Sequence, residues 1–179
     1  GNTGETATVI GLGGAFLTAS SFADGIATVH CALDLGITYY DTSPMYCHGA
    51  SQAVLGAALH GRTENYLLAT KLGYFRQPLR FHSHEALATQ FEENLRLLRR
   101  DRVDTLQLHE ADFHHWWSTD TTHTGRLQPD RNYDFNNATP RQVLRDLKAP
   151  RHCRFIGISG NTADNMIILR AASAETLAA

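Results

Sequence analysis

The stretch Ile37-Thr-Tyr-Tyr-Asp41 joins a short apolar run to a carboxylate, and the chain repeats this arrangement. A second run, Tyr66-Leu-Leu-Ala-Thr70, leads into Lys71, and a third, Thr105-Leu-Gln-Leu108, leads into His109. Each run is followed by a loop and then a helical pattern, which predicts parallel strands that alternate with helices. Because the carboxyl ends of such strands face one way, we expect Asp41, Lys71 and His109 to lie along one edge of a sheet.

The rest of the chain extends this alternation. Further strands are expected from Val9 to Gly13 and from Phe155 to Ser159. The patterns predict helices at Ala23 to Leu35, after a cap at Ser51, from Ser83 to Arg100, from Thr139 to about Lys148, and from Ala163 onward. In the Ser83 helix, the expected buried stripe is Leu87, Phe91, Leu95 and Leu98.

About five strand–helix units follow from this pattern, in one α/β domain over residues 1–179. Consecutive strand ends that carry polar groups favour a (β/α)8 TIM barrel over a doubly wound sheet. Such a barrel has eight units, so we expect a partial barrel that lacks the last three. The first and last strands would then have unpaired edges, which favour self-association.

Composition excludes several classes of protein. Hydrophobic residues make up 42% of the chain and the formal net charge is −2, which favours a folded domain without a nucleic-acid or membrane partner. No apolar stretch approaches the ~20 residues of a membrane-spanning helix, and the first residues do not resemble a signal peptide. The three cysteines form no Cys-x-x-Cys motif and indicate free thiols in a cytoplasmic protein. Ten histidines lack zinc-hydrolase spacing, so no metal site is expected.

Tyr46 follows Asp41 closely, so an acid, a phenol, an amine and an imidazole are expected together at the strand ends. This set suggests proton transfer to or from an oxygen. Each residue also has a structural interpretation. Asp41 and Lys71 could form a structural ion pair, Tyr46 could be a half-buried aromatic residue, and His109 could cap a loop. Trp116 and Trp117 either line a sugar pocket or belong to a surface loop.

Four segments resemble the aldo-keto reductase superfamily. They are Asp41-Thr-Ser-Pro-Met-Tyr46 and its continuation to Gly56, Leu68-Ala-Thr-Lys71, Val103-Asp-Thr-Leu-Gln-Leu-His109, and Phe155-Ile-Gly-Ile-Ser159-Gly160. Their combination in this order is specific, whereas each segment alone is weak. The motifs Asp41-Thr-Ser-Pro44 and His109-Glu-Ala-Asp112 together are most similar to the sugar-dehydrogenase branch of this family, such as L-galactose and L-fucose dehydrogenases.

The resemblance implies hydride transfer between NAD or NADP and the carbonyl or hydroxyl carbon of a sugar or small aldehyde. It implies that Tyr46 is the general acid and base, with Lys71 and Asp41 beside it and His109 as a donor to the same oxygen. A phenol has an ordinary pKa near 10, and a neighbouring cation favours its phenolate form.

The resemblance also assigns cofactor contacts to Asp41, Ser159 and Gly160. Gly13 and Gly14 either let the backbone approach the cofactor or form a tight turn. Gly160 stands where many members have Asn. Because the family's last three strands help to bind the cofactor, an alternative is a non-catalytic or partner-dependent barrel fragment, or a redox-sensing subunit.

Overall fold

A computed structural model describes residues 3–148 and 152–161 of the chain. Its centre is one parallel sheet in the order β1-β2-β3-β4-β5, so neighbours in sequence are also neighbours in space. The strands are β1 (Leu12–Gly13), β2 (Tyr39–Asp41), β3 (Leu67–Leu72), β4 (Val103–Leu108) and β5 (Cys153–Ile158). This order confirms the alternating α/β architecture and the partial barrel of about five units.

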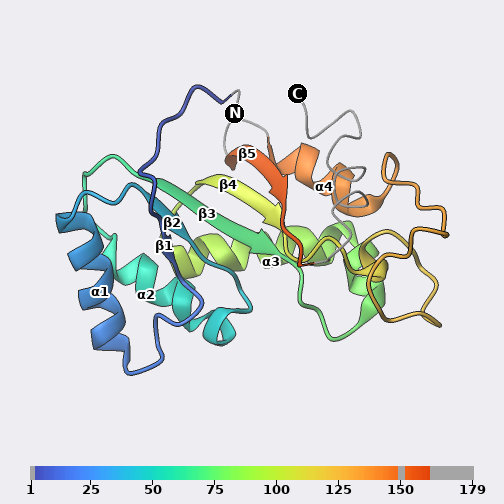
Figure 1. Ribbon diagram of the computed structural model, residues 1–179, viewed down its shortest axis with the longest axis horizontal. Coiled ribbons are helices and arrows are strands. Elements are labelled where there is room, and N and C mark those ends of the chain that lie inside the picture. Colours follow the sequence, from blue (N-terminus) through green and yellow to red (C-terminus); the bar gives the residue numbers. More distant parts are fainter. Residues whose placement is uncertain (1–2, 149–151, 162–179) are drawn as a thin grey trace.

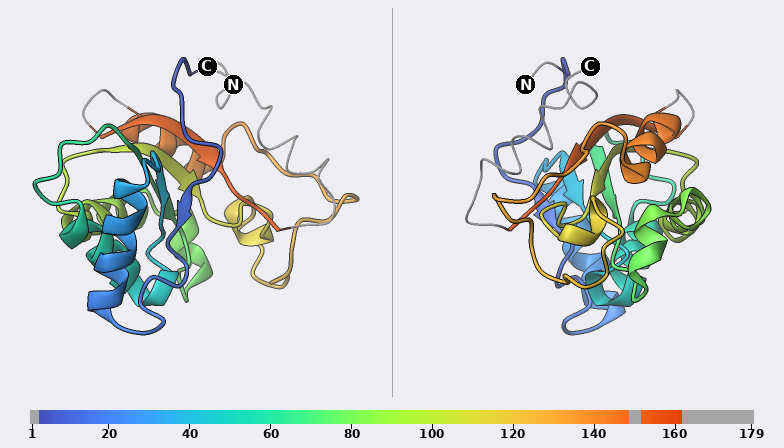
Figure 2. Two further views of the ribbon diagram at one scale, coloured as in Figure 1. Left: turned by 60° about the vertical axis from the view of Figure 1, so that its left-hand side comes forward. Right: turned by 90° about the vertical axis from the view of Figure 1, so that its right-hand side faces the viewer.

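Helices connect the strands and follow one another along the outside of the curved sheet (Figures 1 and 2). The α-helices are α1 (Phe22–Asp34), α2 (Ala50–Ala58), α3 (His84–Leu98) and α4 (Thr139–Leu147), and three 3-10 turns are η1 (Tyr46–Gly49), η2 (Pro78–His82) and η3 (His114–Trp116). The hydroxyl of Ser83 caps α3 by accepting a hydrogen bond from the amide of Ala86 at 3.1 Å. Gly36 has φ +76° directly after α1, as expected for a helix stop.

The main core lies between the outer face of the sheet and these helices. Tyr40, Leu72 and Leu108 are completely buried there, and they pack with Val54 and Leu87 from the helices. In β4 and β5 the strand residues of the opposite face, such as Thr105 and Gln107, are only partly buried, whereas β3 is buried on both faces from Leu68 to Leu72. The described part of the sheet is therefore well covered on its outer face and more open on the other face along β4 and β5.

Three expectations differ from the structure in detail. The first strand is only two residues long, because pairing with β2 is limited to Leu12 and Gly13. Ser51 does not cap α2; Gly49 occupies that position with φ +87°, and the Ser51 hydroxyl is buried against Thr42 Oγ1 at 2.8 Å. The helix expected from Ala163 lies outside the described residues.

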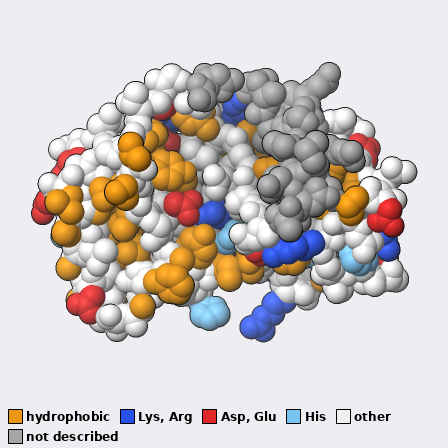
Figure 3. Space-filling view, in the orientation of Figure 1, with side chains coloured by type: hydrophobic (Ala, Val, Ile, Leu, Met, Phe, Trp, Pro, Cys, Tyr) orange, Lys and Arg blue, Asp and Glu red, His pale blue; other side chains and the backbone are white. Residues whose placement is uncertain are grey.

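The two sheet edges are unpaired within residues 3–148 and 152–161, since β1 pairs only with β2 and β5 only with β4. Exposed hydrophobic side chains accompany the β1 edge, among them Val9, Ile10 and Phe16. In Figure 3, hydrophobic atoms gather on the left of the molecule, where Figure 1 places α1 and the segment before it. None of the described helices is long and apolar enough to cross a membrane.

Candidate functional site

Asp41 and Lys71 form an ion pair at the carboxyl edge of the sheet. Lys71 lies near the end of β3, and its Nζ is 2.5 Å from Asp41 Oδ1 and 2.9 Å from the carbonyl oxygen of Thr42. The Lys71 side chain is 5% exposed and that of Asp41 is 24% exposed, so the pair is shielded from water on the lysine side. Asn94 of α3 fixes the strand here by donating to the Lys71 carbonyl at 2.9 Å.

Tyr46 begins the turn that follows β2, and this turn brings its ring over the ion pair. Lys71 Nζ lies 4.8 Å from the centre of the Tyr46 ring. The Tyr46 side chain is half-buried, and its hydroxyl has no hydrogen-bond partner among the described residues. The phenol is therefore beside the ammonium group and available to a bound molecule.

His109 extends β4 by one residue, because its amide donates to the Leu72 carbonyl at 2.9 Å. Its ring lies between two aromatic residues, with centroid distances of 5.5 Å to Tyr46 and 4.7 Å to Tyr74. Burial and the nearby Lys71 lower the pKa of His109 from 6.5 to about 4. The imidazole is therefore neutral at pH 7.

Tyr74 and Glu110 form a hydrogen-bonded pair beside His109. The Tyr74 hydroxyl donates to Glu110 Oε2, and burial together with this bond raises the pKa of Tyr74 above its usual value. Both residues have positive φ, +65° for Tyr74 and +50° for Glu110, which is uncommon for residues with a side chain. Sequence reasoning missed this pair, because a left-handed tyrosine leaves no mark in the sequence pattern.

Buried polar contacts anchor the loop that follows His109. Asp112 is completely buried and pairs with Arg126, which also approaches Glu110 at 3.6 Å. The indole nitrogens of Trp116 and Trp117 donate to the carbonyl oxygens of His109 and Ala111. Trp116 and Trp117 are thus buried supports of the site, which differs from both roles considered for them.

The remaining candidate residues, Ser159, Gly13, Gly14 and Gly160, lie along the same carboxyl edge of the sheet. The Ser159 hydroxyl accepts from the Glu110 amide at 3.2 Å, which ties β5 to the residue after His109. Gly14 packs tightly, because a Cβ there would lie 2.5 Å from Ser51 Oγ, whereas a Cβ on Gly13 would meet nothing within 4 Å. Gly160 is exposed. Close packing thus explains Gly14, whereas Gly13 leaves open space at the edge.

A pocket of about 250 Å³ opens beside His109. Its lining is mainly aromatic and comprises Tyr74, Phe75, Arg76, Phe81, His109, Phe113 and His115. Burial lowers the pKa of His115 to about 4, so this second imidazole is also neutral at pH 7. The pocket has room for a small organic molecule against His109, which is the one candidate proton-transfer group in its lining.

Asn94 is a further residue that sequence reasoning missed, and here the sequence did hold a signal. The buried positions of α3 are Leu87, Phe91, Asn94 and Leu98, so an amide stands in the apolar stripe where Leu95 was expected. Polar side chains are seldom buried without a hydrogen-bonding task. The task of Asn94 is to hold the backbone of Lys71.

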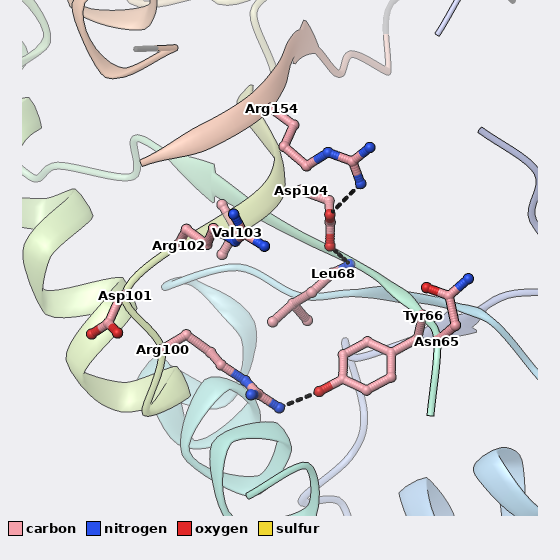
Figure 4. A pocket seen from close by; sticks show the side chains of 9 residues that line it. All are labelled: Asn65, Tyr66, Leu68, Arg100, Asp101, Arg102, Val103, Asp104 and Arg154. Carbon is pink, nitrogen blue, oxygen red and sulfur yellow. Dashed lines mark hydrogen bonds and ion pairs between the residues drawn. The ribbon is translucent and has the colours of Figure 1, made fainter. Parts of the chain in front are cut away.

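A larger hollow, of about 580 Å³, lies at the opposite end of the strands (Figure 4). Arg154 there bonds Asp104 and Glu5, and Arg100 bonds the Tyr66 hydroxyl and the Leu59 carbonyl. Asp104 also accepts from the amide of Leu68 at 2.8 Å. The hollow is far along the strands from His109 and is rich in internal ion pairs. No group of three His, Cys, Asp or Glu side chains suited to a metal occurs in the part of the chain that the structure describes.

Comparisons with known proteins show the family and the fold of the chain. The profile described as the aldo/keto reductase family matches residues 9–177. L-galactose dehydrogenase from Arabidopsis thaliana is 32% identical over 171 residues, which cover 92% of this chain and 48% of that protein. Aldo-keto reductase YhdN from Bacillus subtilis is 34% identical over 121 residues, or 62% of this chain and 37% of that protein.

A solved aldo-keto reductase from Klebsiella pneumoniae, in complex with NADPH, has the same fold. It superposes with a TM-score of 0.65 at 23% identity and covers 92% of this chain and 49% of that one. The chain therefore spans about half the length of L-galactose dehydrogenase and of this structure, and less of YhdN.

Proposed function

This chain belongs to the aldo/keto reductase family, and from that premise we propose that it carries the proton-transfer groups of an NAD(P)-dependent oxidoreductase. The observation that carries the proposal is the convergence of four groups at one edge of the sheet. They are the Asp41–Lys71 ion pair, the hydroxyl of Tyr46, which is unpartnered among residues 3–148 and 152–161, and the neutral imidazole of His109.

The proposed chemistry follows from these positions. When hydride reaches a carbonyl carbon, negative charge develops on the oxygen and a nearby acid must neutralise it. Tyr46 is proposed to supply that proton in reduction and to accept it in oxidation. Lys71 provides a positive charge beside the phenol, Asp41 holds the Lys71 ammonium in place, and His109 donates a hydrogen bond that orients the oxygen.

The cofactor is proposed to be NADP or NAD, and when bound it supplies or accepts the hydride. The edge fits the reacting end of such a molecule, because Gly13 leaves open space and Asp41 stays partly exposed despite its ion pair. Asp41, Ser159 and Gly160 would hold this end. The Klebsiella pneumoniae structure, solved with NADPH, supports the cofactor class.

The proposed substrate is a small carbonyl compound or a sugar, and the likeness to L-galactose dehydrogenase supports the sugar. The pocket beside His109 has room for either. A cytoplasmic location is proposed from the three cysteines, all of which are free thiols.

Replacing Tyr46 with Phe tests the catalytic role. The variant keeps the ring over Lys71 and loses only the hydroxyl, so we expect turnover to fall at least about 100-fold while cofactor binding is retained. NADPH oxidation with a panel of aldoses and aldehydes measures turnover, and nicotinamide fluorescence titration measures binding. Tyr66→Phe, at the other end of the strands, is the matched control and should turn over normally. Wild-type turnover by Tyr46→Phe would refute the role.

The open sheet favours a second candidate function. In it, the same residues act only when a partner chain completes the barrel. The unpaired edges and the exposed Val9, Ile10 and Phe16 support it. Saturable NADPH binding by the isolated monomer would argue against this candidate. Binding only in an associated form, detected by light scattering during the titration, would favour it.

A further inference from the structure

We propose that Ser43 is a positioning residue that holds His109 as the neutral tautomer with its proton on Nε2. Ser43 lies two residues after β2, between the candidate residues Asp41 and Tyr46. Its purpose in catalysis rests on the proposed function, but the tautomer itself is a property of the folded chain. The two can therefore be tested separately.

The contact between Ser43 and His109 is buried on both sides. Ser43 is completely buried and His109 is 7% exposed. Ser43 Oγ lies 2.8 Å from His109 Nδ1, a normal hydrogen-bond length. The same oxygen accepts a hydrogen bond from the amide of Met45 at 3.1 Å, which fixes the hydroxyl within the turn.

The available protons determine which atom donates in the Ser43 Oγ–His109 Nδ1 hydrogen bond. The Ser43 hydroxyl has a single proton, and His109 Nδ1 is its only acceptor among the described residues. If Nδ1 carried the proton instead, the Ser43 hydroxyl proton would be buried without an acceptor, which folded proteins avoid. The hydroxyl therefore donates to Nδ1, and a neutral ring must then carry its own proton on Nε2.

In this tautomer the proton lies on Nε2, the ring nitrogen that is free to contact a bound molecule. Nε2 has no hydrogen-bond partner among residues 3–148 and 152–161, and it is not one of their buried unpartnered atoms. His109 also lines the aromatic pocket. The Nε2 proton is thus available to an oxygen in that pocket, on the ring that also contacts Tyr46 edge to face at a centroid distance of 5.5 Å. The opposite tautomer would present a lone pair and repel the same oxygen.

Nitrogen NMR measures the tautomer directly on the full chain without substrate or cofactor. A long-range proton–nitrogen correlation spectrum at pH 7 separates protonated from unprotonated ring nitrogens of each histidine. The His109 signals are those that disappear in His109→Gln. We expect an unprotonated Nδ1 and a protonated Nε2. A protonated Nδ1 in the wild-type chain would overturn the proposal, whatever any variant does.

Three variants test the cause. Ser43→Ala should remove the single tautomer and move the two His109 nitrogen signals toward each other, whereas Ser43→Thr keeps a hydroxyl and should restore the wild-type pattern. Ser51→Ala is the matched control, because Ser51 is an equally buried serine whose hydroxyl contacts Thr42 and not His109. An unchanged His109 pattern in a folded Ser43→Ala protein would contradict the role of Ser43.

Kinetics then test the purpose of the tautomer. With a chain that turns over, Ser43→Ala should lower kcat about tenfold, the usual effect of one lost hydrogen bond, with cofactor affinity unchanged. A normal kcat with an altered tautomer would refute the positioning role. A chain without any turnover would count against the proposed function, yet its spectrum would still decide the tautomer.

Discussion

At the amino end of the sheet, the charged side chains of Arg154, Asp104 and Arg100 have hydrogen-bond partners within the chain. At the carboxyl end, the Asp41–Lys71 pair is also satisfied, but Tyr46 and His109 each keep a polar group without a partner in the described chain. Both ends belong to the same strands and have similar residue types. The difference supports the proposal that the carboxyl end of the strands, rather than the amino end, binds a ligand, as in barrel enzymes generally.

Among the proposed variants, Lys71→Met should cause the largest loss of stability and turnover, because both depend on the Lys71 ammonium group. Asp41 loses its counter-ion and the Thr42 carbonyl loses a donor, so we expect the free energy of unfolding to fall by about 3 kcal/mol and turnover at least about 100-fold. Urea denaturation and NADPH oxidation measure the two effects.

The double variant Asp41→Asn with Lys71→Met tests the cause of the instability. It removes the unpaired carboxylate, so it should recover part of the lost stability but none of the turnover. Equal stability of the single and double variants would show that the ion pair does not explain the loss.

Lowering the pH should destabilise the folded chain through His109, whose pKa is lowered to about 4 in the folded state. The unfolded chain has an ordinary histidine pKa near 6.5 and binds the proton first, so the free energy of unfolding should fall as the pH falls from about 6.5 to about 4. The expected loss is about 3 kcal/mol for this residue. Urea denaturation at a series of pH values measures it.

His109→Gln should remove this part of the pH dependence, and the difference between the two curves isolates it from the other histidines. Parallel curves for the wild-type chain and the variant would contradict the prediction.

Asp104→Ala at the amino end should have the smallest effect. The variant leaves the Leu68 amide without its acceptor and releases one bond of Arg154. We expect a loss of about 1–2 kcal/mol in the free energy of unfolding and no change in turnover per folded molecule. Denaturation and activity measured on the same preparation test both. A large fall in turnover would show that the two ends do not have separate roles.

The sequence was sufficient for the order of the strands and for the four candidate groups at their ends, because both depend on strand periodicity and chain order. It was insufficient where the outcome depends on tertiary packing. Ser83 caps a helix and Ser51 does not, although both precede helical patterns, because Ser51 lies inside the first turn of α2 with its hydroxyl buried against Thr42, the residue after β2. The contacts of Ser43 and Tyr74 with His109 join different strands, and no local pattern encodes them.

The segment after β4 continues the hydrogen-bond ladder on both sides: the His109 amide bonds the carbonyl of Leu72, and the amides of Glu110 and Ala111 bond Ser159. Three consecutive residues are thereby secured to both flanking strands, whatever lies beyond the outer edges. Pairing a second polypeptide with β1 or β5 would consequently leave these backbone contacts in place, which makes the two edges of the described sheet suitable points for engineered complementation.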